Sequence, residues 1–177
     1  VEPVVFIPGF GGTFSADETP AGVNNWLTTR GLPPTSLALE PFGGVYQNIV
    51  ESLKEVGYEE SGIGQKLFVV NWDWRLPAAP TDTNSASSPN GILGDVSEAG
   101  ITDAVFQTGL DYLGNVLADI RTLFGNETKI DVIAHSTGGL IARSYIQSAA
   151  YGLDGLPTID DLVLVGVPNE GATDPFN

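Results

Sequence analysis

Ser136 lies between a short apolar run and a glycine pair, in the stretch DVIAHSTGGLIAR at residues 131–143. A serine hydroxyl is a weak nucleophile unless it is held exposed, near a base and opposite donors that stabilise an oxyanion. A sharp strand-to-helix turn gives that exposure, and it accepts only small neighbours because the backbone approaches itself. Ala134, Gly138 and Gly139 meet this demand, which predicts a nucleophile elbow at residues 134–138. The alternative is a turn that only caps a helix.

A second glycine-rich turn, Pro-Gly-Phe-Gly-Gly at residues 8–12, follows the first apolar run of the chain. A turn at this place can direct a backbone N–H at the nucleophile, and one oxyanion donor contributes roughly 3–4 kcal/mol. We predict an oxyanion hole formed by the N–H groups of Phe10 and Thr137, with Gly11 in the adjoining pocket. The alternative is a turn that only reverses the chain.

His135 is the only histidine, and it stands directly before Ser136. Successive side chains of a strand point to opposite sides, so we expect the ring of His135 to pack beneath the elbow and not to act as the base. Lysine is no better placed. Lys54 falls on an expected helix, and Lys66 and Lys129 begin expected strands, far from the serine. The sequence therefore identifies no base for Ser136.

Strand and helix patterns alternate around these residues. Continuous apolar runs predict strands at residues 3–8, 67–72, 129–136 and 161–168. Apolar residues at helical spacing predict helices at 45–56, 101–124 and 138–151. The first two helices place these apolar residues on one face: Val45, Ile49, Leu53, Val56; and Phe106, Leu110, Leu113, Leu117, Ile120, Phe124. Strands that are apolar throughout are typical of a mostly parallel sheet covered by helices on both faces.

We therefore expect residues 1–177 to form a single α/β domain. Residues 13–44 are rich in Pro and Gly and are expected to be an irregular connection. Residues 76–100 contain many Pro, Ser, Asn and Gly residues without a period. A loop of that length inside a compact domain is expected to be a lid, a mobile binding loop or a disordered segment.

Composition excludes several classes of function. Seven Lys and Arg against 22 Asp and Glu give a formal charge of −15, which would repel nucleic acid. No apolar run approaches the roughly 20 residues of a membrane span, so we expect no stable membrane insertion, while a neutral lipid or ester remains compatible. Without cysteine and with one histidine, neither a disulfide nor a protein zinc site is expected. We therefore expect neither a metal nor a cofactor.

Four segments carry a resemblance to a known family. They are VVFIPGFGGT (4–13), NWDWR (71–75), DVIAHSTGGLIARSYI (131–146) and LVLVGVPNEGA (162–172), and they span nearly the whole chain. The chain resembles an α/β-hydrolase of the lipase type, and it is most similar to the lecithin:cholesterol acyltransferase-like and bacterial lipase families. The resemblance implies an α/β-hydrolase core and a Ser, Asp, His triad that acts on carboxylic esters, often lipid esters.

In that family the acid and the histidine follow the serine along the chain. We therefore expect that residues 1–177 are a truncated piece whose triad Asp and His lie beyond it, and that this piece alone is inactive or weak. If the strand order follows the family, the second and fourth strands are open edges, and the missing C-terminal part would be their partner. Glu170, after the fourth strand, is a weak candidate for the acid or a residue of the pocket wall.

Asp73, Trp74 and Arg75 follow the second expected strand at the carboxyl edge of the sheet, where open α/β folds bind ligands. In one interpretation Asp73 and Trp74 line the pocket, and Trp74 offers an apolar face to an acyl chain. In the other, a buried pair of Asp73 and Arg75 fixes the loop.

The function expected from these residues is that of a serine esterase or lipase, which forms an acyl-enzyme on Ser136 with a small-molecule or lipid ester. A lipid acyltransferase would use the same residues with an alcohol in place of water. A non-catalytic α/β module that binds a lipid or a protein is the alternative from another class. Acidity and the resemblance favour a secreted, extracellular protein.

Overall fold

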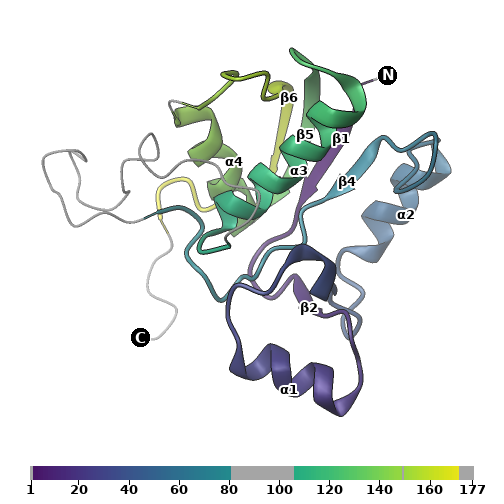
Figure 1. Ribbon diagram of the computed structural model, residues 1–177, viewed down its shortest axis with the longest axis vertical. Helices are drawn as coiled ribbons and strands as arrows, with labels where there is room; N and C mark the ends of the chain where they lie inside the picture. The colour runs from purple at the N-terminus through teal and green to yellow at the C-terminus, as the bar shows by residue number, and fades with distance from the viewer. Residues whose placement is uncertain (1, 81–105, 149, 172–177) are drawn as a thin grey trace, which may run out of the picture.

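A central sheet of four strands organises the protein, for which a computed structural model describes residues 2–80, 106–148 and 150–171. The strands lie in the order β4-β1-β5-β6, and each neighbouring pair is parallel (Figure 1). Their bounds are β1 (Val4–Ile7), β4 (Leu67–Val69), β5 (Lys129–His135) and β6 (Thr158–Val165). The predicted α/β class and the predicted edge positions of the second and fourth strands are confirmed.

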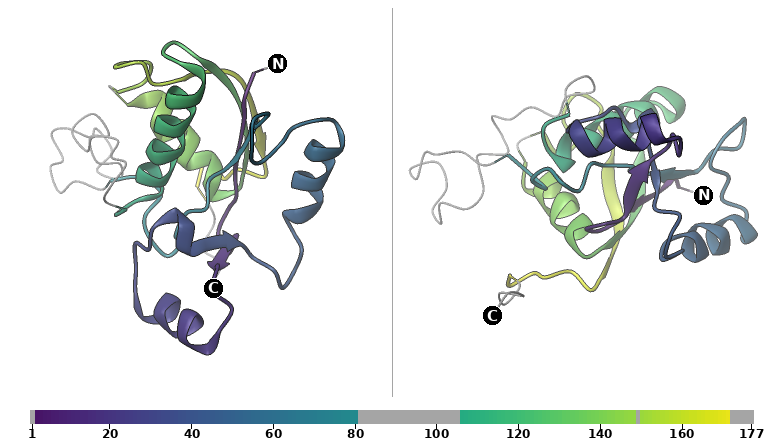
Figure 2. Two further views of the ribbon diagram at one scale, coloured as in Figure 1. Left: turned by 45° about the vertical axis from the view of Figure 1, so that its right-hand side comes forward. Right: turned by 90° about the horizontal axis from the view of Figure 1, so that it is seen from below.

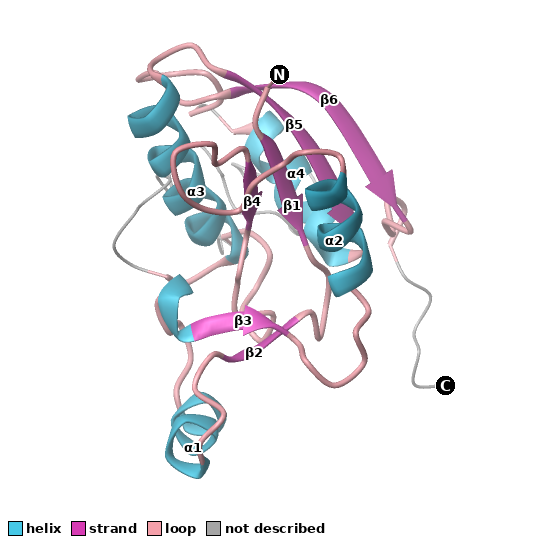
Figure 3. Ribbon diagram, turned by 90° about the vertical axis from the view of Figure 1, so that its right-hand side faces the viewer, coloured by secondary structure: helices cyan, strands magenta, loops and turns pink. Residues whose placement is uncertain are grey.

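Three helices cover the two faces of this sheet unequally. Helices α3 (Gly109–Phe124) and α4 (Thr137–Gln147) pack on one face, over a large core that includes Ile7, Val132 and Ala134. Helix α2 (Gln47–Glu55) lies on the opposite face near β1 and β4, over a small core of Val4, Phe6, Tyr46, Val50 and Leu67 (Figures 2 and 3). The carboxyl ends of the strands point toward a separate layer formed by residues 13–39.

Helices lie on both faces of the sheet, as expected, but the β5–β6 side of the α2 face is less covered. All four residues of β1 are buried, whereas β5 begins with exposed Lys129 and then alternates between buried and half-buried residues. On β6, Val163 is 52% exposed and Val165 is 46% exposed. Both residues are on the α2 face, paired with Ile133 and His135 of β5, and no helix in the described ranges covers this part of the sheet.

Several element boundaries differ from the predicted ones. Helix α2 begins at Gln47 and ends at Glu55, so Val45 and Val56 lie outside it and are exposed, whereas Tyr46, directly before the helix, is buried. Strand β4 ends at Val69 and helix α4 at Gln147, both earlier than predicted, and β6 begins at Thr158, earlier than residue 161. Phe106 precedes α3, because the Asp111 carboxylate accepts a hydrogen bond from the Thr108 N–H and fixes the helix start there.

Residues 13–44 contain regular structure where an irregular connection was expected. Strands β2 (Thr13–Ser15) and β3 (Leu37–Leu39) pair antiparallel, and helix α1 (Pro20–Thr28) and the short 3-10 helix η1 (Pro34–Ser36) connect them. The start of α1 has a local cause. Thr19 accepts a hydrogen bond from the Gly22 N–H, and Pro20 occupies the first helical position, where it removes no hydrogen bond.

Residues 81–100 of the expected lid lie outside the described residues, as do residues 101–105 of the expected second helix. Within the described part of the chain, no helix has both the length and the apolar character needed to cross a membrane.

Candidate active site

Ser136 occupies a strained turn between β5 and α4. Its φ of 52° and ψ of −126° lie in a region that residues other than glycine rarely adopt, at a cost on the order of 1–3 kcal/mol. Two backbone hydrogen bonds hold the turn: Ser136 N donates to Val165 O at 2.9 Å, and Gly139 N donates to Ser136 O at 3.0 Å. The neighbouring strand and the first turn of the helix thus impose the strain on the serine.

The small residues of the elbow are required by close backbone approach. A Cβ atom on Gly138 would lie 2.4 Å from the carbonyl oxygen of Ile7, at the end of β1. A Cβ atom on Gly139 would lie 2.2 Å from the Val167 side chain. The elbow therefore packs directly against the segments that leave β1 and β6, and this packing is the steric reason for its glycines.

The glycine-rich turn, residues 8–12, lies beside the elbow. A Cβ atom on Gly9 would be 2.7 Å from Ser136 Cβ, so these two residues are in direct contact. Trp72 Nε1 donates to Pro8 O at 2.8 Å, Gly9 N donates to Tyr46 Oη at 3.0 Å, and Gly12 N donates to Gly9 O at 3.0 Å. The turn is thus anchored to the segment after β4, to the residue before α2 and to itself.

The two N–H groups predicted to form an oxyanion hole are available. Neither Phe10 N nor Thr137 N donates a hydrogen bond to any residue that the structure describes. Thr137 is the first residue of α4, where N–H groups lack an acceptor within the helix and carry its partial positive charge. A developing negative charge on an oxygen beside Ser136 would therefore meet unpaired donors.

Aromatic side chains border this region. Phe10 is 70% exposed, and its ring lies 4.4 Å from the ring of Trp74, measured between centroids. Trp74 Nε1 donates to Thr13 O at 2.8 Å, which fixes the indole beyond the glycine-rich turn. Gly11, with a φ of +73°, has open space around its Cα. Phe10, Gly11 and Trp74 thus form one apolar border.

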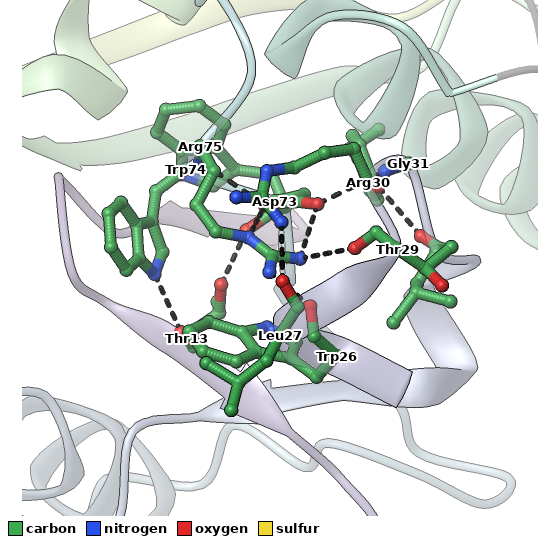
Figure 4. Close-up of polar contacts among 12 residues, drawn as sticks. Thr13, Trp26, Leu27, Thr29, Arg30, Gly31, Asp73, Trp74 and Arg75 are labelled. Atoms are coloured by element: carbon green, nitrogen blue, oxygen red, sulfur yellow. Dashed lines mark hydrogen bonds and ion pairs between the residues drawn. The ribbon is translucent and has the colours of Figure 1, made fainter. Parts of the chain in front are cut away.

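Asp73 and Arg75 form the buried pair of the alternative interpretation (Figure 4). Arg75 donates to both carboxylate oxygens of Asp73, from Nε at 2.6 Å and from Nη2 at 2.7 Å. Asp73 is completely buried and also accepts a hydrogen bond from Gly31 N at 3.1 Å. Arg75 continues to the carbonyl oxygens of Trp26 and Thr29, at the end of α1. The Asp73–Arg75 pair therefore connects the end of α1 to the loop after β4, as in the second of the two interpretations.

A pocket of about 370 Å³ lies along α4 near the elbow. Leu140 and Ser144 of α4 form one wall, and residues that follow β4 and β6 form the rest, among them Pro77, Ala78 and Pro168. Most of the lining surface is apolar, which suits the hydrocarbon part of a ligand, and Arg143, Gln147 and Asn169 add polar groups to it.

The groups considered as a base lie away from the Ser136 hydroxyl, which has no hydrogen bond to a described residue. His135 Nδ1 contacts Tyr46 Oη at 2.9 Å, beneath the elbow. Lys129 is at the opposite end of β5 and pairs with Asp160, and this hydrogen bond raises the pKa of Lys129, which opposes its use as a base. Lys54 pairs with Glu60 on the surface.

Lys66 and Glu170 lie at opposite ends of the sheet. Lys66 directly precedes β4, at the end of the sheet opposite the elbow. Glu170 is exposed in the turn after β6, and its carboxylate makes no hydrogen bond within the described part of the chain. The described residues contain no group of three His, Asp or Glu side chains that could bind a metal ion.

Sequence reasoning missed Tyr46 and the aromatic contact of Phe10. The helical spacing predicted Val45 and Val56 on the apolar face of α2, and no local motif indicates a role for the tyrosine directly before the helix.

Comparison of the chain with models of known protein families and with curated proteins finds no match.

Proposed function

We propose that this protein has an α/β-hydrolase core and is a serine ester hydrolase of the lipase type, with Ser136 as the nucleophile. The observation that carries the proposal is the strained backbone of Ser136 at a strand-to-helix turn. Such strain persists only where the surrounding structure imposes it, and it is frequent at catalytic residues. The unpaired N–H groups of Phe10 and Thr137 beside the serine give independent support.

In the proposed reaction, Ser136 Oγ attacks the carbonyl carbon of an ester while its proton passes to a base. The carbonyl oxygen becomes an oxyanion that accepts hydrogen bonds from the N–H groups of Phe10 and Thr137. The C–O bond to the alcohol breaks, the alcohol takes up a proton, and an acyl-enzyme remains. Water then releases the acid and restores the serine. The apolar border of Phe10 and Trp74 would contact the hydrocarbon part of the ester, which favours lipid or other apolar esters as substrates.

We do not assign the base to His135, because its ring packs against Tyr46 beneath the elbow and makes no hydrogen bond to the Ser136 hydroxyl within the described residues. The sequence printed here contains no second histidine. We therefore expect residues 1–177 alone to react slowly, because an oxyanion hole and binding can retain a residual acceleration of about 10³–10⁴ over water without a complete triad.

The test is covalent labelling by a fluorophosphonate at high concentration, followed over time by intact mass. We expect one adduct per chain, located on Ser136 by peptide mapping. Ser136→Ala should abolish the adduct, and Ser61→Ala, which removes an exposed serine, should label like the wild type. Absence of labelling in the wild type, or labelling that persists in Ser136→Ala, would contradict the proposal.

A non-catalytic α/β binding module is the second candidate. The observation that favours it is the position of the only histidine, which contacts Tyr46, while the serine hydroxyl has no hydrogen-bond partner among the described residues. The exposed β6 face would then be a surface for a protein partner. The same labelling experiment separates the candidates, because a binding module predicts no adduct at Ser136.

A further inference from the structure

The hydroxyl of Tyr46 connects the glycine-rich turn to the elbow from below. Gly9 N donates to Tyr46 Oη at 3.0 Å, and Tyr46 Oη lies 2.9 Å from His135 Nδ1. Tyr46 is 6% exposed, and its ring contacts Phe6 of β1 and His135 of β5. The Tyr46 hydroxyl thus contacts both Gly9, which is 37 positions before it in the chain, and His135, which is 89 positions after it.

The direction of these hydrogen bonds follows from the chemistry of the groups. Burial raises the pKa of Tyr46, so the phenol keeps its proton. Its oxygen accepts from the Gly9 N–H, and its O–H group is left to donate to His135 Nδ1. Nδ1 of His135 is therefore an acceptor, and a neutral imidazole then carries its proton on Nε2.

Tyr46 is itself fixed by the segments on either side of it. It is the residue that precedes α2, and the Glu40 carboxylate organises the chain before it. Glu40 accepts hydrogen bonds from the N–H groups of Gly43, Val45 and Phe42, at 2.7, 3.1 and 3.0 Å. These hydrogen bonds lower the pKa of Glu40 and so keep its carboxylate charged. The hydrogen bond from Gly43 has the largest effect. The phenol thus has a defined position from which to hold Gly9.

Gly9 links the Tyr46 hydroxyl to Ser136 and Phe10. It contacts Ser136, where its Cβ would lie 2.7 Å from Ser136 Cβ, and it directly precedes Phe10. Without the phenol oxygen, the Gly9 N–H would be left without an acceptor beneath the elbow, which favours a shift of the turn. A displacement of about 1 Å at a reacting centre can lower a rate by about 10²-fold.

We propose that Tyr46 and His135 are positioning residues that hold the Phe10 N–H at the oxyanion site through the Gly9 N–H, Tyr46 Oη and His135 Nδ1. This inference rests on the proposed function, and it gives the only histidine of the chain a role that is separate from proton transfer. His135 orients the phenol O–H, and the phenol oxygen fixes the glycine-rich turn against Ser136.

The experiment measures the rate of fluorophosphonate labelling at Ser136 in matched variants. Tyr46→Phe, which removes only the hydroxyl, should slow labelling by about 10-fold or more. Tyr58→Phe is the control, since Tyr58 packs against the same small core and makes no side-chain hydrogen bond within the described part of the chain. His135→Leu should slow labelling like Tyr46→Phe. His135→Asn, whose amide oxygen can accept from the phenol, should recover most of the rate.

A second measurement detects the hydrogen bonds without reference to catalysis. The ¹⁵N shifts of the His135 ring should show an unprotonated Nδ1 and a protonated Nε2 in the wild type. The amide of Gly9 should exchange faster with solvent in Tyr46→Phe than in Tyr58→Phe. Thermal unfolding of each variant identifies any that fail to fold.

The outcomes distinguish the two proposals. Labelling of Ser136 at equal rates in the wild type, Tyr46→Phe and His135→Leu would overturn the positioning role and leave the proposed function standing. A proton on Nδ1 of His135 would also overturn it. Absence of labelling at Ser136 in the wild type would overturn the proposed function and, with it, this role.

Discussion

At the scale of single residues, the elbow combines strain with close packing. Ser136 adopts a conformation that costs free energy, and the glycines around it allow backbone segments to approach within contact distance. Helix propensity alone would disfavour Gly138 in the first turn of α4, since glycine is about 1 kcal/mol less favourable than alanine in a helix. The glycine is explained by the Ile7 and Pro8 carbonyl oxygens beside it.

Gly138→Ala should therefore destabilise the protein although it improves helix propensity. The new Cβ would lie 2.4 Å from Ile7 O and 2.7 Å from Pro8 O, both backbone atoms that move only with the end of β1. Overpacking of this kind costs roughly 1–3 kcal/mol. We expect urea unfolding to show a lower free energy of unfolding by about that amount.

Gly64→Ala is the matched control for this substitution. A Cβ atom on Gly64 meets only the Glu59 side chain, at 3.7 Å, so its effect should stay within about 0.5 kcal/mol. Equal stability of Gly138→Ala and wild type would show that the elbow is less tightly packed than described.

At the scale of elements, Arg75 joins the α1 layer to the sheet. Its guanidinium contacts the Asp73 carboxylate, the carbonyl oxygens at the end of α1 and the face of the Trp26 ring, 4.0 Å from the centroid. Arginine suits this place because its planar group donates in several directions at once. The fold of residues 13–39 thus depends on a residue beyond β4.

Replacement of Arg75 by Met should leave the Asp73 carboxylate buried without its cation. Breaking a buried pair from one side costs about 3–5 kcal/mol, and we expect urea unfolding to show a loss of that size. Limited proteolysis should also cleave within α1 more rapidly, because the carbonyl oxygens of Trp26 and Thr29 lose their donor.

Lys54→Met is the control, because it removes the cation of an exposed ion pair. The Lys54–Glu60 pair is exposed, with side-chain exposures of 47% and 36%, and such pairs contribute about 0–1 kcal/mol. A similar loss of stability in both variants would argue against a special role for the buried pair.

At the scale of the whole molecule, an exposed apolar face coexists with a large negative charge. Val163 and Val165 are half exposed on an edge strand of the sheet, and such edges pair readily with other chains. The formal charge of −15 opposes self-association, and Asp160 and Asp161 place negative charge on β6 itself. Association should therefore depend on ionic strength.

We expect sedimentation velocity to show little association at low salt and more at about 1 M NaCl, where the Debye length falls to about 3 Å. Val163→Lys should reduce the association at high salt, because it places a charge on the exposed face. Ile63→Lys, at a fully exposed position in the loop before β4, is the control and should leave it unchanged. Association that falls as salt rises would contradict this account.

Part of this architecture could be predicted because its signals are local. Continuous apolar runs identify β1, β5 and β6, and the glycines at residues 9–12 and 138–139 mark backbone that must pass close to other backbone. Helix α1 was missed although Thr19 and Pro20 are a start signal, since the helix is short and its surroundings are rich in Pro and Gly.

The sequence by itself determined the alternation of strands and helices in a parallel sheet and the small residues of the turn at Ser136, because periodicity and steric demand act locally. Only the tertiary structure decided that Asp73 is sequestered by Arg75, and that Tyr46 connects Gly9 to His135. These contacts join residues from separate elements, and their geometry follows from how α2 and the strands pack. No local sequence pattern predicts that the Tyr46 hydroxyl contacts His135, which is 89 positions away in the chain.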